Sequence, residues 1–169
     1  MSTIICKKEK NWICVYADKQ LTWWYSCLAE WDKIVMLDNT ISQENVIMWA
    51  VWNYVNIWLL KWFYEKYIIE NRGMINTFDK ICAYEFYNLL RSNWILDQDT
   101  SLVIVSKTIQ VIIHNWTMED IQGDVAIWSW SQFALSLMKA WIDIDKVFKI
   151  TSNLDIYTWK EYTKLIIKN

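Results

Sequence analysis

No linker divides this chain, which narrows the folds that it can adopt. Its 169 residues include no proline and only two glycines, and no segment is rich in proline, serine and glycine or in one kind of charge. We find no internal repeat. With 54% hydrophobic residues, a chain of this length can bury a sizeable core. The sequence therefore predicts one domain over residues 1–169, of which residues 1–11 form a flexible N-terminal segment.

The net charge of the chain and its few cysteine and histidine residues exclude several classes of protein. A net charge of −2 and a pI near 5.4 argue against a protein that wraps nucleic acid with a basic face. The four cysteines form no CxxC pair, and His114 is the single histidine, so a structural zinc site lacks ligands. We therefore expect reduced thiols, no metal and no cofactor.

Neither a signal peptide nor a membrane span is expected. The start of the chain carries Lys7, Lys8 and Lys10 after only two isoleucines, unlike a signal peptide. Residues 45–60 are the longest uncharged stretch, and they are fewer than the roughly 20 apolar residues of a membrane span. We expect a soluble cytoplasmic protein with no membrane partner.

Runs of aromatic and β-branched residues predict the strands. Residues 12–25 form one or two strands, interrupted at Asp18, Lys19 and Gln20. An acidic turn joins two later strands over residues 115–118 and 125–130. The remaining strands are predicted over residues 33–37, 67–69, 82–90, 146–150 and 165–168.

Apolar residues spaced three and four apart predict three helices. The first covers residues 44–61 and includes Trp49, and the aromatic residues on its other side favour contact with a partner. The second lies within residues 97–115, although residues 102–105 fit a strand equally well, and the third covers residues 132–142. The fold class is therefore α+β: one antiparallel sheet of about seven to eight strands backed by three helices.

Catalytic motifs are missing from the sequence. A Ser-His-Asp or Cys-His arrangement would need His114, and neither a GxSxG elbow nor a cysteine signature accompanies it. Two glycines cannot form a Walker loop or a GxGxxG motif. Paired carboxylates such as Asp143 and Asp145 fit solvated helix caps. We therefore expect no catalytic residue and no enzyme.

Several aromatic residues lie where a core does not require them. Trp31 and Phe78 fall in short loops, and Trp128 and Trp130 are two apart, so they project from the same face of a strand. Rings that separate loops present over one sheet face make a stacking slot for a planar, preferably cationic ring.

The order of these segments resembles the eukaryotic translation initiation factor 4E family, which binds the messenger RNA cap. The resemblance covers most of Leu21 to Ile150. It is carried by WWY at 23–25, Trp31, WAVWNYV at 49–55, YIIENRGMINTFD at 67–79 and GDVAIW at 123–128. It implies a cupped-hand fold with one curved sheet, and a function in translation initiation.

The resemblance implies a role for each matching residue. Trp31 and Phe78 would stack on 7-methylguanosine, whose positive charge strengthens the stack. Asp79 would accept hydrogen bonds from the Watson–Crick edge, and Trp128 would contact the methyl group. Trp49 would hold a 4G-type scaffold or a 4E-binding protein, so the implied partners are capped mRNA and one of these proteins, without DNA.

The phosphate-binding positions of that family are occupied differently here. They fall on Glu85, Glu119 and Asp124, which would repel a triphosphate. Four residues remain as candidates for phosphate or RNA contacts: Lys160, Lys80, Trp116 and Trp130.

Two other functions stay open. The chain could keep the fold and the Trp49 surface without binding the cap, and act as a competitor or decoy. Alternatively, Asp79, Glu119 and Asp124 could hold a metal for a nucleotide-processing reaction.

Overall fold

The computed structural model describes most of the chain. The described residues are 3–23, 26–30, 32–39, 44–51, 57–72, 74–75, 77–128, 131–154 and 161–168. They divide into two compact units, Met1–Lys33 with Gly123–Asn169 and Ile34–Gln122. We describe each unit by itself.

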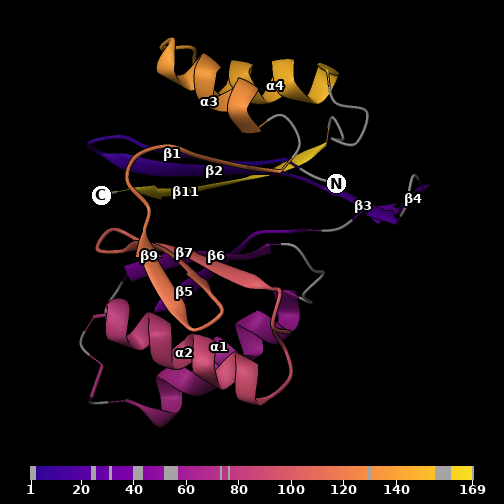
Figure 1. Ribbon diagram of the computed structural model, residues 1–169. Coiled ribbons are helices and arrows are strands. Elements are labelled where there is room, and N and C mark those ends of the chain that lie inside the picture. Colours follow the sequence, from indigo (N-terminus) through magenta and orange to yellow (C-terminus); the bar gives the residue numbers. More distant parts are fainter. Residues whose placement is uncertain are drawn as a thin grey trace. The chain divides into compact units, whose positions relative to one another are not determined.

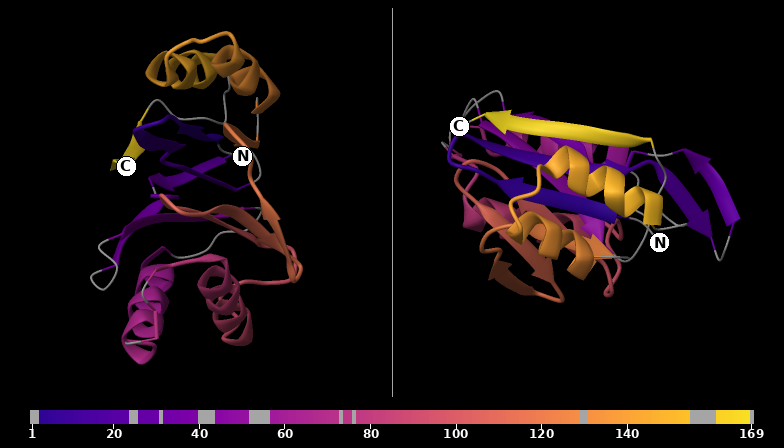
Figure 2. Two further views of the ribbon diagram at one scale, coloured as in Figure 1. Left: turned by 90° about the vertical axis from the view of Figure 1, so that its left-hand side faces the viewer. Right: turned by 90° about the horizontal axis from the view of Figure 1, so that it is seen from above.

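The first unit is built on a four-stranded antiparallel sheet (Figures 1 and 2). Its strand order is β10 (Val125–Trp128), β1 (Thr3–Lys8), β2 (Trp12–Asp18) and β11 (Tyr162–Lys168). A hairpin of β3 (Gln20–Trp23) and β4 (Ser26–Glu30) continues from β2. Helices α3 (Ser131–Lys139) and α4 (Ile144–Leu154) cover one face of the four-stranded sheet.

Aromatic and aliphatic side chains hold these two helices to the sheet. Tyr16 of β2 stacks on Phe148 of α4, with ring centres 5.6 Å apart, and both are buried. Val147 and Ile144 join Phe148 on the same side of α4, at helical spacing. Burial of this stripe on the strand face gives the unit its core.

The second unit is a five-stranded antiparallel sheet with two helices on one face (Figure 1). Its strands, in both spatial and chain order, are β5 (Val35–Asn39), β6 (Glu44–Val51), β7 (Ser101–Val105), β8 (Gln110–His114) and β9 (Thr117–Asp120). Helices α1 (Ile57–Glu70) and α2 (Lys80–Ser92) pack against Val46, Met48, Leu102 and Ile104.

Some of the predicted elements are confirmed. Residues 12–25 contain two strands, β2 and β3, and residues 102–105 belong to strand β7, as the alternative to a helix there allowed. The predicted helix over 132–142 corresponds to α3, and the final strand over 165–168 lies within β11. The strand predicted at 33–37 overlaps β5.

Five predicted elements have the wrong type. One is the helix predicted within 97–115, where residues 101–105 and 110–114 form strands β7 and β8. Residues 44–51 form strand β6 instead of a helix, because apolar side chains on both of its faces hide the period of two. Residues 67–69 and 82–90 lie in helices α1 and α2, and residues 146–150 lie in α4. Their aromatic and β-branched residues favour strands locally, but packing on a sheet decides for helices.

The predicted single curved sheet with three helices is also wrong. The described residues form two larger sheets, a separate two-stranded hairpin and four helices. The strands near 115–118 and 125–130 do not form a pair, because β9 pairs with β8 and β10 pairs with β1. Residues 1–11, expected to be a flexible segment, contain β1, which lies between β10 and β2.

Candidate functional site

Three strands bring polar residues together at one end of the four-stranded sheet. Strand β1 begins at Thr3, and its pairing of Ile4 with Ala17 continues toward Asp18, the last residue of β2. On the other side of β2, Tyr162 at the start of β11 is opposite Asp18. The beginning of the chain and Asp18 are therefore close in the sheet, because antiparallel neighbours place an N-terminal end beside a C-terminal end.

A buried ion pair occupies this end of the sheet. Lys33 Nζ lies 2.8 Å from Asp18 Oδ2, with 11% of the lysine side chain and none of the aspartate side chain exposed. Asp18 ends a strand whose preceding residues are apolar and buried, and Lys33 follows hairpin β3–β4. Removing two charges from water is costly unless they are paired, so the fold holds this ammonium and carboxylate at a fixed position.

A second polar group lies beside this pair in sequence and is more exposed. Asp32 Oδ1 accepts a hydrogen bond from Thr163 Oγ1 and lies 3.8 Å from Lys19 Nζ. The backbone N–H of Lys19 donates to the carbonyl of Glu161 at 3.1 Å. These contacts tie the segment that carries Lys33 to β11 and to the residue after β2.

The arrangement suits chemistry on a hydroxyl group. Thr3 begins β1, whose next residue, Ile4, pairs with Ala17 beside Asp18, and Ser2 precedes Thr3 in the sequence. A nearby ammonium lowers the pKa of a hydroxyl and stabilises negative charge that develops on it. The Asp18 carboxylate, 2.8 Å away, holds the Lys33 ammonium in place.

Three residues of the predicted cap site lie outside the described residues: Trp31, Trp130 and Lys160. Trp128 is the last residue of β10, and its backbone is paired with that of Thr3. The geometry of a stacking slot around Trp31 is therefore not part of the described structure.

Phe78 and its neighbours stabilise the second unit. Phe78 is fully buried and contacts the rings of Tyr64 and Tyr67, so no ring face is open to a ligand. Asp79 is the N-cap of α2 and accepts a hydrogen bond from the Cys82 backbone N–H at 3.0 Å. Lys80 forms an exposed ion pair of 2.6 Å with Asp120.

Trp49 and Trp116 also differ from their predicted surroundings. Trp49 lies in β6 and is fully buried, so it is not on an exposed helix as the predicted partner surface requires. Trp116 lies in the β8–β9 turn, half exposed, with the Arg91 guanidinium 5.3 Å from its ring centre. The roles assigned to these residues depended on the resemblance to factor 4E and have no support without it.

The acidic residues near the predicted phosphate path have ordinary partners. Glu85 accepts a hydrogen bond of 2.7 Å from Tyr67, and burial, followed by this bond, raises the pKa of Tyr67. Asp124 accepts a backbone hydrogen bond from Lys8 at 3.4 Å. Among the described residues, no three His, Cys, Asp or Glu side chains are grouped closely enough to hold a metal.

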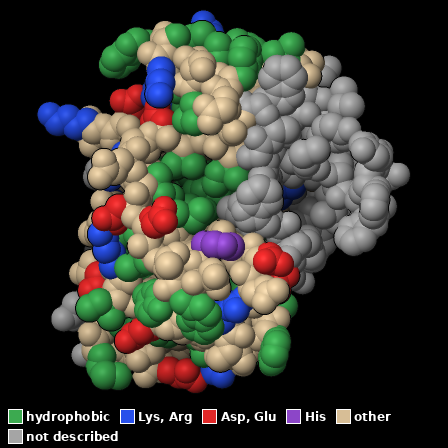
Figure 3. Space-filling model, viewed as in Figure 1, with side chains coloured by type: hydrophobic (Ala, Val, Ile, Leu, Met, Phe, Trp, Pro, Cys, Tyr) green, Lys and Arg blue, Asp and Glu red, His purple; other side chains and the backbone are tan. Residues whose placement is uncertain are grey.

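His114 lies at the surface of the second unit (Figure 3) and contacts a serine. Its Nδ1 is 2.9 Å from Ser101 Oγ, because Ser101 and His114 are neighbours at the ends of β7 and β8. Ser101 is 2% exposed, so its hydroxyl is not presented to a substrate in this arrangement.

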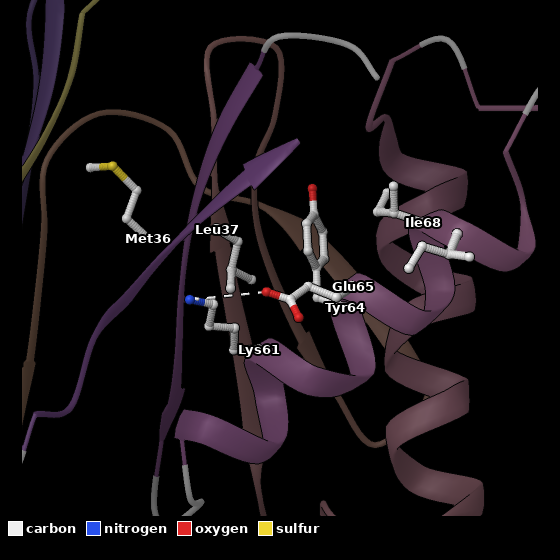
Figure 4. Close-up of a pocket in the computed structure, with 7 residues that line it drawn as sticks. Met36, Leu37, Lys61, Tyr64, Glu65 and Ile68 are labelled. Carbon is white, nitrogen blue, oxygen red and sulfur yellow. Dashed lines mark ion pairs between the residues drawn. The ribbon is translucent and has the colours of Figure 1, made fainter. Parts of the chain in front are cut away.

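A shallow cavity of about 320 Å³ lies between β5 and α1 in the second unit (Figure 4). The Tyr64 ring and Leu37 line it, and Lys61 and Glu65 are 4.0 Å apart at its rim. It contains no group with an evident catalytic function. None of the helices in the described ranges is both long and apolar enough to cross a membrane.

Comparison with known proteins establishes the fold. No protein-family model matches the sequence, and the curated proteins give no match. Several solved structures match almost the whole chain. Eukaryotic HslV from Trypanosoma brucei matches at 18% identity, over 99% of each chain, with a TM-score of 0.68. BPH from Thiobacillus denitrificans in complex with epoxomicin matches at 13% identity, over 98% of each chain, with a TM-score of 0.68. Anbu (ancestral beta-subunit) from Yersinia bercovieri matches at 8% identity, over 98% of this chain and 81% of that chain, with a TM-score of 0.74.

These matches overturn the resemblance to initiation factor 4E. The chain has the fold of HslV and Anbu, and not the cupped hand of a cap-binding protein. The predictions of a translation initiation function, of capped mRNA and a 4G-type scaffold as partners, and of a protein that is not an enzyme are therefore wrong. Ordered aromatic residues supported that resemblance, but aromatic residues recur throughout a chain with 14 tryptophans and are not specific to one fold.

Sequence reasoning missed the Asp18–Lys33 pair. Asp18 was interpreted as part of a polar interruption between strands, and Lys33 as the start of a strand. One signal was available: Asp18 directly follows the apolar run Ile13–Ala17, where a charge needs a partner.

Proposed function

We propose that this chain is a peptidase whose nucleophile is the hydroxyl of Ser2, the residue that precedes β1 in the sequence. The observation that carries the proposal is the buried Asp18–Lys33 pair at the sheet end where β1 begins. The fold supports it, because HslV and Anbu are proteasome-type peptidase subunits and BPH was solved with epoxomicin.

The proposed reaction divides peptide hydrolysis into two steps. Cleavage of the bond before Ser2 gives this residue a free α-amine, which accepts the proton as Ser2 Oγ attacks the substrate carbonyl. The peptide C–N bond then breaks, the leaving amine takes the proton, and an ester remains on Ser2. Water hydrolyses the ester and restores the hydroxyl.

Lys33 and Asp18 have separate parts in this scheme. The Lys33 ammonium stabilises negative charge on Ser2 Oγ and keeps its pKa low. Asp18 holds Lys33 in position through their contact of 2.8 Å. Both groups act without moving, because burial fixes them before substrate arrives.

The first experiment measures the mass of the purified chain and its hydrolysis of fluorogenic peptide amides. Because Anbu is a beta-subunit by name, each size-exclusion fraction is assayed. We expect hydrolysis by chains that begin at Ser2, and a covalent adduct of epoxomicin on the N-terminal peptide. Ser2→Ala abolishes both, whereas Ser136→Ala, which removes an exposed hydroxyl from α3, leaves both unchanged.

Two results would contradict the proposal. Full hydrolysis by Ser2→Ala would exclude Ser2, and loss of hydrolysis in Thr3→Val but not in Ser2→Ala would move the nucleophile to Thr3. A processed chain that begins at Ser2 but neither hydrolyses peptide amides nor reacts with epoxomicin, in any fraction, would exclude the peptidase.

A further inference from the structure

Tryptophan occupies three left-handed backbone positions in the described part of the chain. Among the described residues, four that are not glycine have a positive φ: Trp94 (59°), Asn115 (44°), Trp116 (67°) and Trp141 (61°). Asparagine tolerates this region, but a bulky side chain there is a genuine outlier, because its Cβ crowds the backbone. Three of the four are therefore the least expected kind of residue.

Two of these tryptophans are the C′ residues of helices. After α2, the Trp94 N–H donates to the Arg91 carbonyl at 3.1 Å, and the Ile95 N–H donates to the Leu90 carbonyl at 3.0 Å. This bond pattern is the Schellman motif, whose C′ residue is left-handed and usually glycine.

The same motif ends α3. The Trp141 N–H donates to the Met138 carbonyl at 3.0 Å, and the Ile142 N–H donates to the Leu137 carbonyl at 3.2 Å. Trp94 and Trp141 are 92% and 91% exposed, so their rings contribute almost no packing that could offset the strain.

The third tryptophan lies in a two-residue hairpin loop. His114 pairs with Thr117, which leaves Asn115 and Trp116 as the loop between β8 and β9. Positive φ at both loop residues is the type I′ turn, for which Asn-Gly is the strongly preferred sequence. Asn115 fits its position, and Trp116 stands where glycine is expected.

The composition of the whole chain is likewise rich in tryptophan and poor in glycine. It contains 14 tryptophans and two glycines, whereas an average chain of this length has about a dozen glycines and far fewer tryptophans. Lysine greatly outnumbers arginine, as it does when the coding sequence is rich in A and T. In such sequences the GC-rich glycine codons become rare.

The codon UGA differs from the glycine codon GGA by one base, and it is read as tryptophan in some genetic codes and as glycine in others.

We infer that Trp94, Trp116 and Trp141 are encoded by UGA and that the cell of origin inserts glycine at these three positions. Glycine has no Cβ and adopts all three backbone conformations without strain. Backbone N–H and carbonyl groups form both Schellman motifs and the hairpin, although the Trp116 ring also contacts Tyr87 and the Arg91 guanidinium.

The inference is tested on the protein as its cells make it. The coding sequence should read UGA at all three positions, and mass spectrometry of peptides from the protein purified from those cells should give the mass of glycine there. UGG codons at these positions, or peptide masses with tryptophan, would overturn the inference.

A recombinant comparison tests the physical premise independently. In the chain with tryptophan, Trp94→Gly, Trp116→Gly and Trp141→Gly should each raise the equilibrium constant for folding about threefold to tenfold, because relief of strain exceeds the extra entropy of unfolded glycine. The matched control is Trp62→Gly, which changes an exposed tryptophan inside α1 and should lower that constant, because glycine weakens a helix interior. Destabilisation at all three positive-φ positions would show that the tryptophans belong there.

Discussion

Lys164 Nζ of β11 lies 3.1 Å from Asp145 Oδ1 of α4. The same carboxylate accepts a hydrogen bond from the buried Tyr16 hydroxyl, and the lysine ammonium lies 5.0 Å from the centre of the Tyr16 ring. One aspartate in the first turn of α4 therefore connects this helix to two adjacent strands of the sheet below it.

We expect Asp145→Asn to weaken the fold near neutral pH and to have no effect in strong acid. The Tyr16 hydrogen bond, opposed by burial and helped by Lys164, lowers the pKa of Asp145 below its ordinary 3.8. A lowered pKa stabilises the folded state at pH values above the unfolded pKa, and this stabilisation is lost as the pH falls through the folded pKa. Because Asp145 is partly exposed, we expect a loss of about 1 kcal/mol at neutral pH.

Urea unfolding at neutral pH and below about pH 2.5 measures this difference. Glu70→Gln is the control, since it removes an exposed carboxylate of an i,i+4 pair and should cost less than about 0.5 kcal/mol. An equal loss for Asp145→Asn at both pH values would mean that its charge is not involved.

Two thiols that are buried in the first unit, those of Cys6 and Cys14, should react slowly with alkylating reagents. Burial raises the pKa of Cys6 to about 12 and that of Cys14 to about 11, so almost no thiolate is present near pH 8. Iodoacetamide labelling followed by peptide mapping should show that both react at least about a hundredfold more slowly in the folded chain than in urea. Equal rates in the two states would show that the sheet does not protect them.

Local patterns in the sequence predict elements where one face is buried and the other is solvated. Helix α3 and strand β11 meet that condition, and both were predicted. Strand β6 does not, because Ile47 and Trp49 are as buried as Val46 and Met48 on its other face. With apolar residues on both sides, a strand and a helix have the same appearance in sequence.

The sequence contains a helix-start signal for α2, but the resemblance to factor 4E led to a different interpretation of it. Asp79 is an N-cap followed by apolar residues at helical spacing, Cys82, Ala83, Phe86 and Leu90. The resemblance to factor 4E assigned Asp79 to a ligand instead. For the candidate site, the sequence indicates that Asp18 needs a partner but not which residue it is, because Lys33 lies 15 positions further along the chain and only the fold brings the two together.

Trp49 should matter for stability, in contrast to the partner surface that the sequence suggested. Its side chain is fully buried, so Trp49→Ala should cost about 3–5 kcal/mol of the free energy of unfolding. Trp62→Ala is the matched control, because Trp62 is 53% exposed and its ring contacts the edge of Phe63 and the Lys66 ammonium at the surface of α1; we expect a cost below about 1 kcal/mol. Urea unfolding of both variants compares them, and similar losses would contradict the burial of Trp49.

The last prediction separates the structural part of the Asp18–Lys33 pair from its proposed catalytic part. Lys33→Met leaves the Asp18 carboxylate buried without its partner at 2.8 Å, so we expect a loss of about 3–5 kcal/mol. Adding Asp18→Asn removes the remaining charge, and the double variant should recover much of that stability. Peptide hydrolysis should stay undetectable in the double variant, because no ammonium remains to stabilise charge on the nucleophile. A stable double variant that hydrolyses peptides at the rate of the unaltered chain would confine the pair to a structural role.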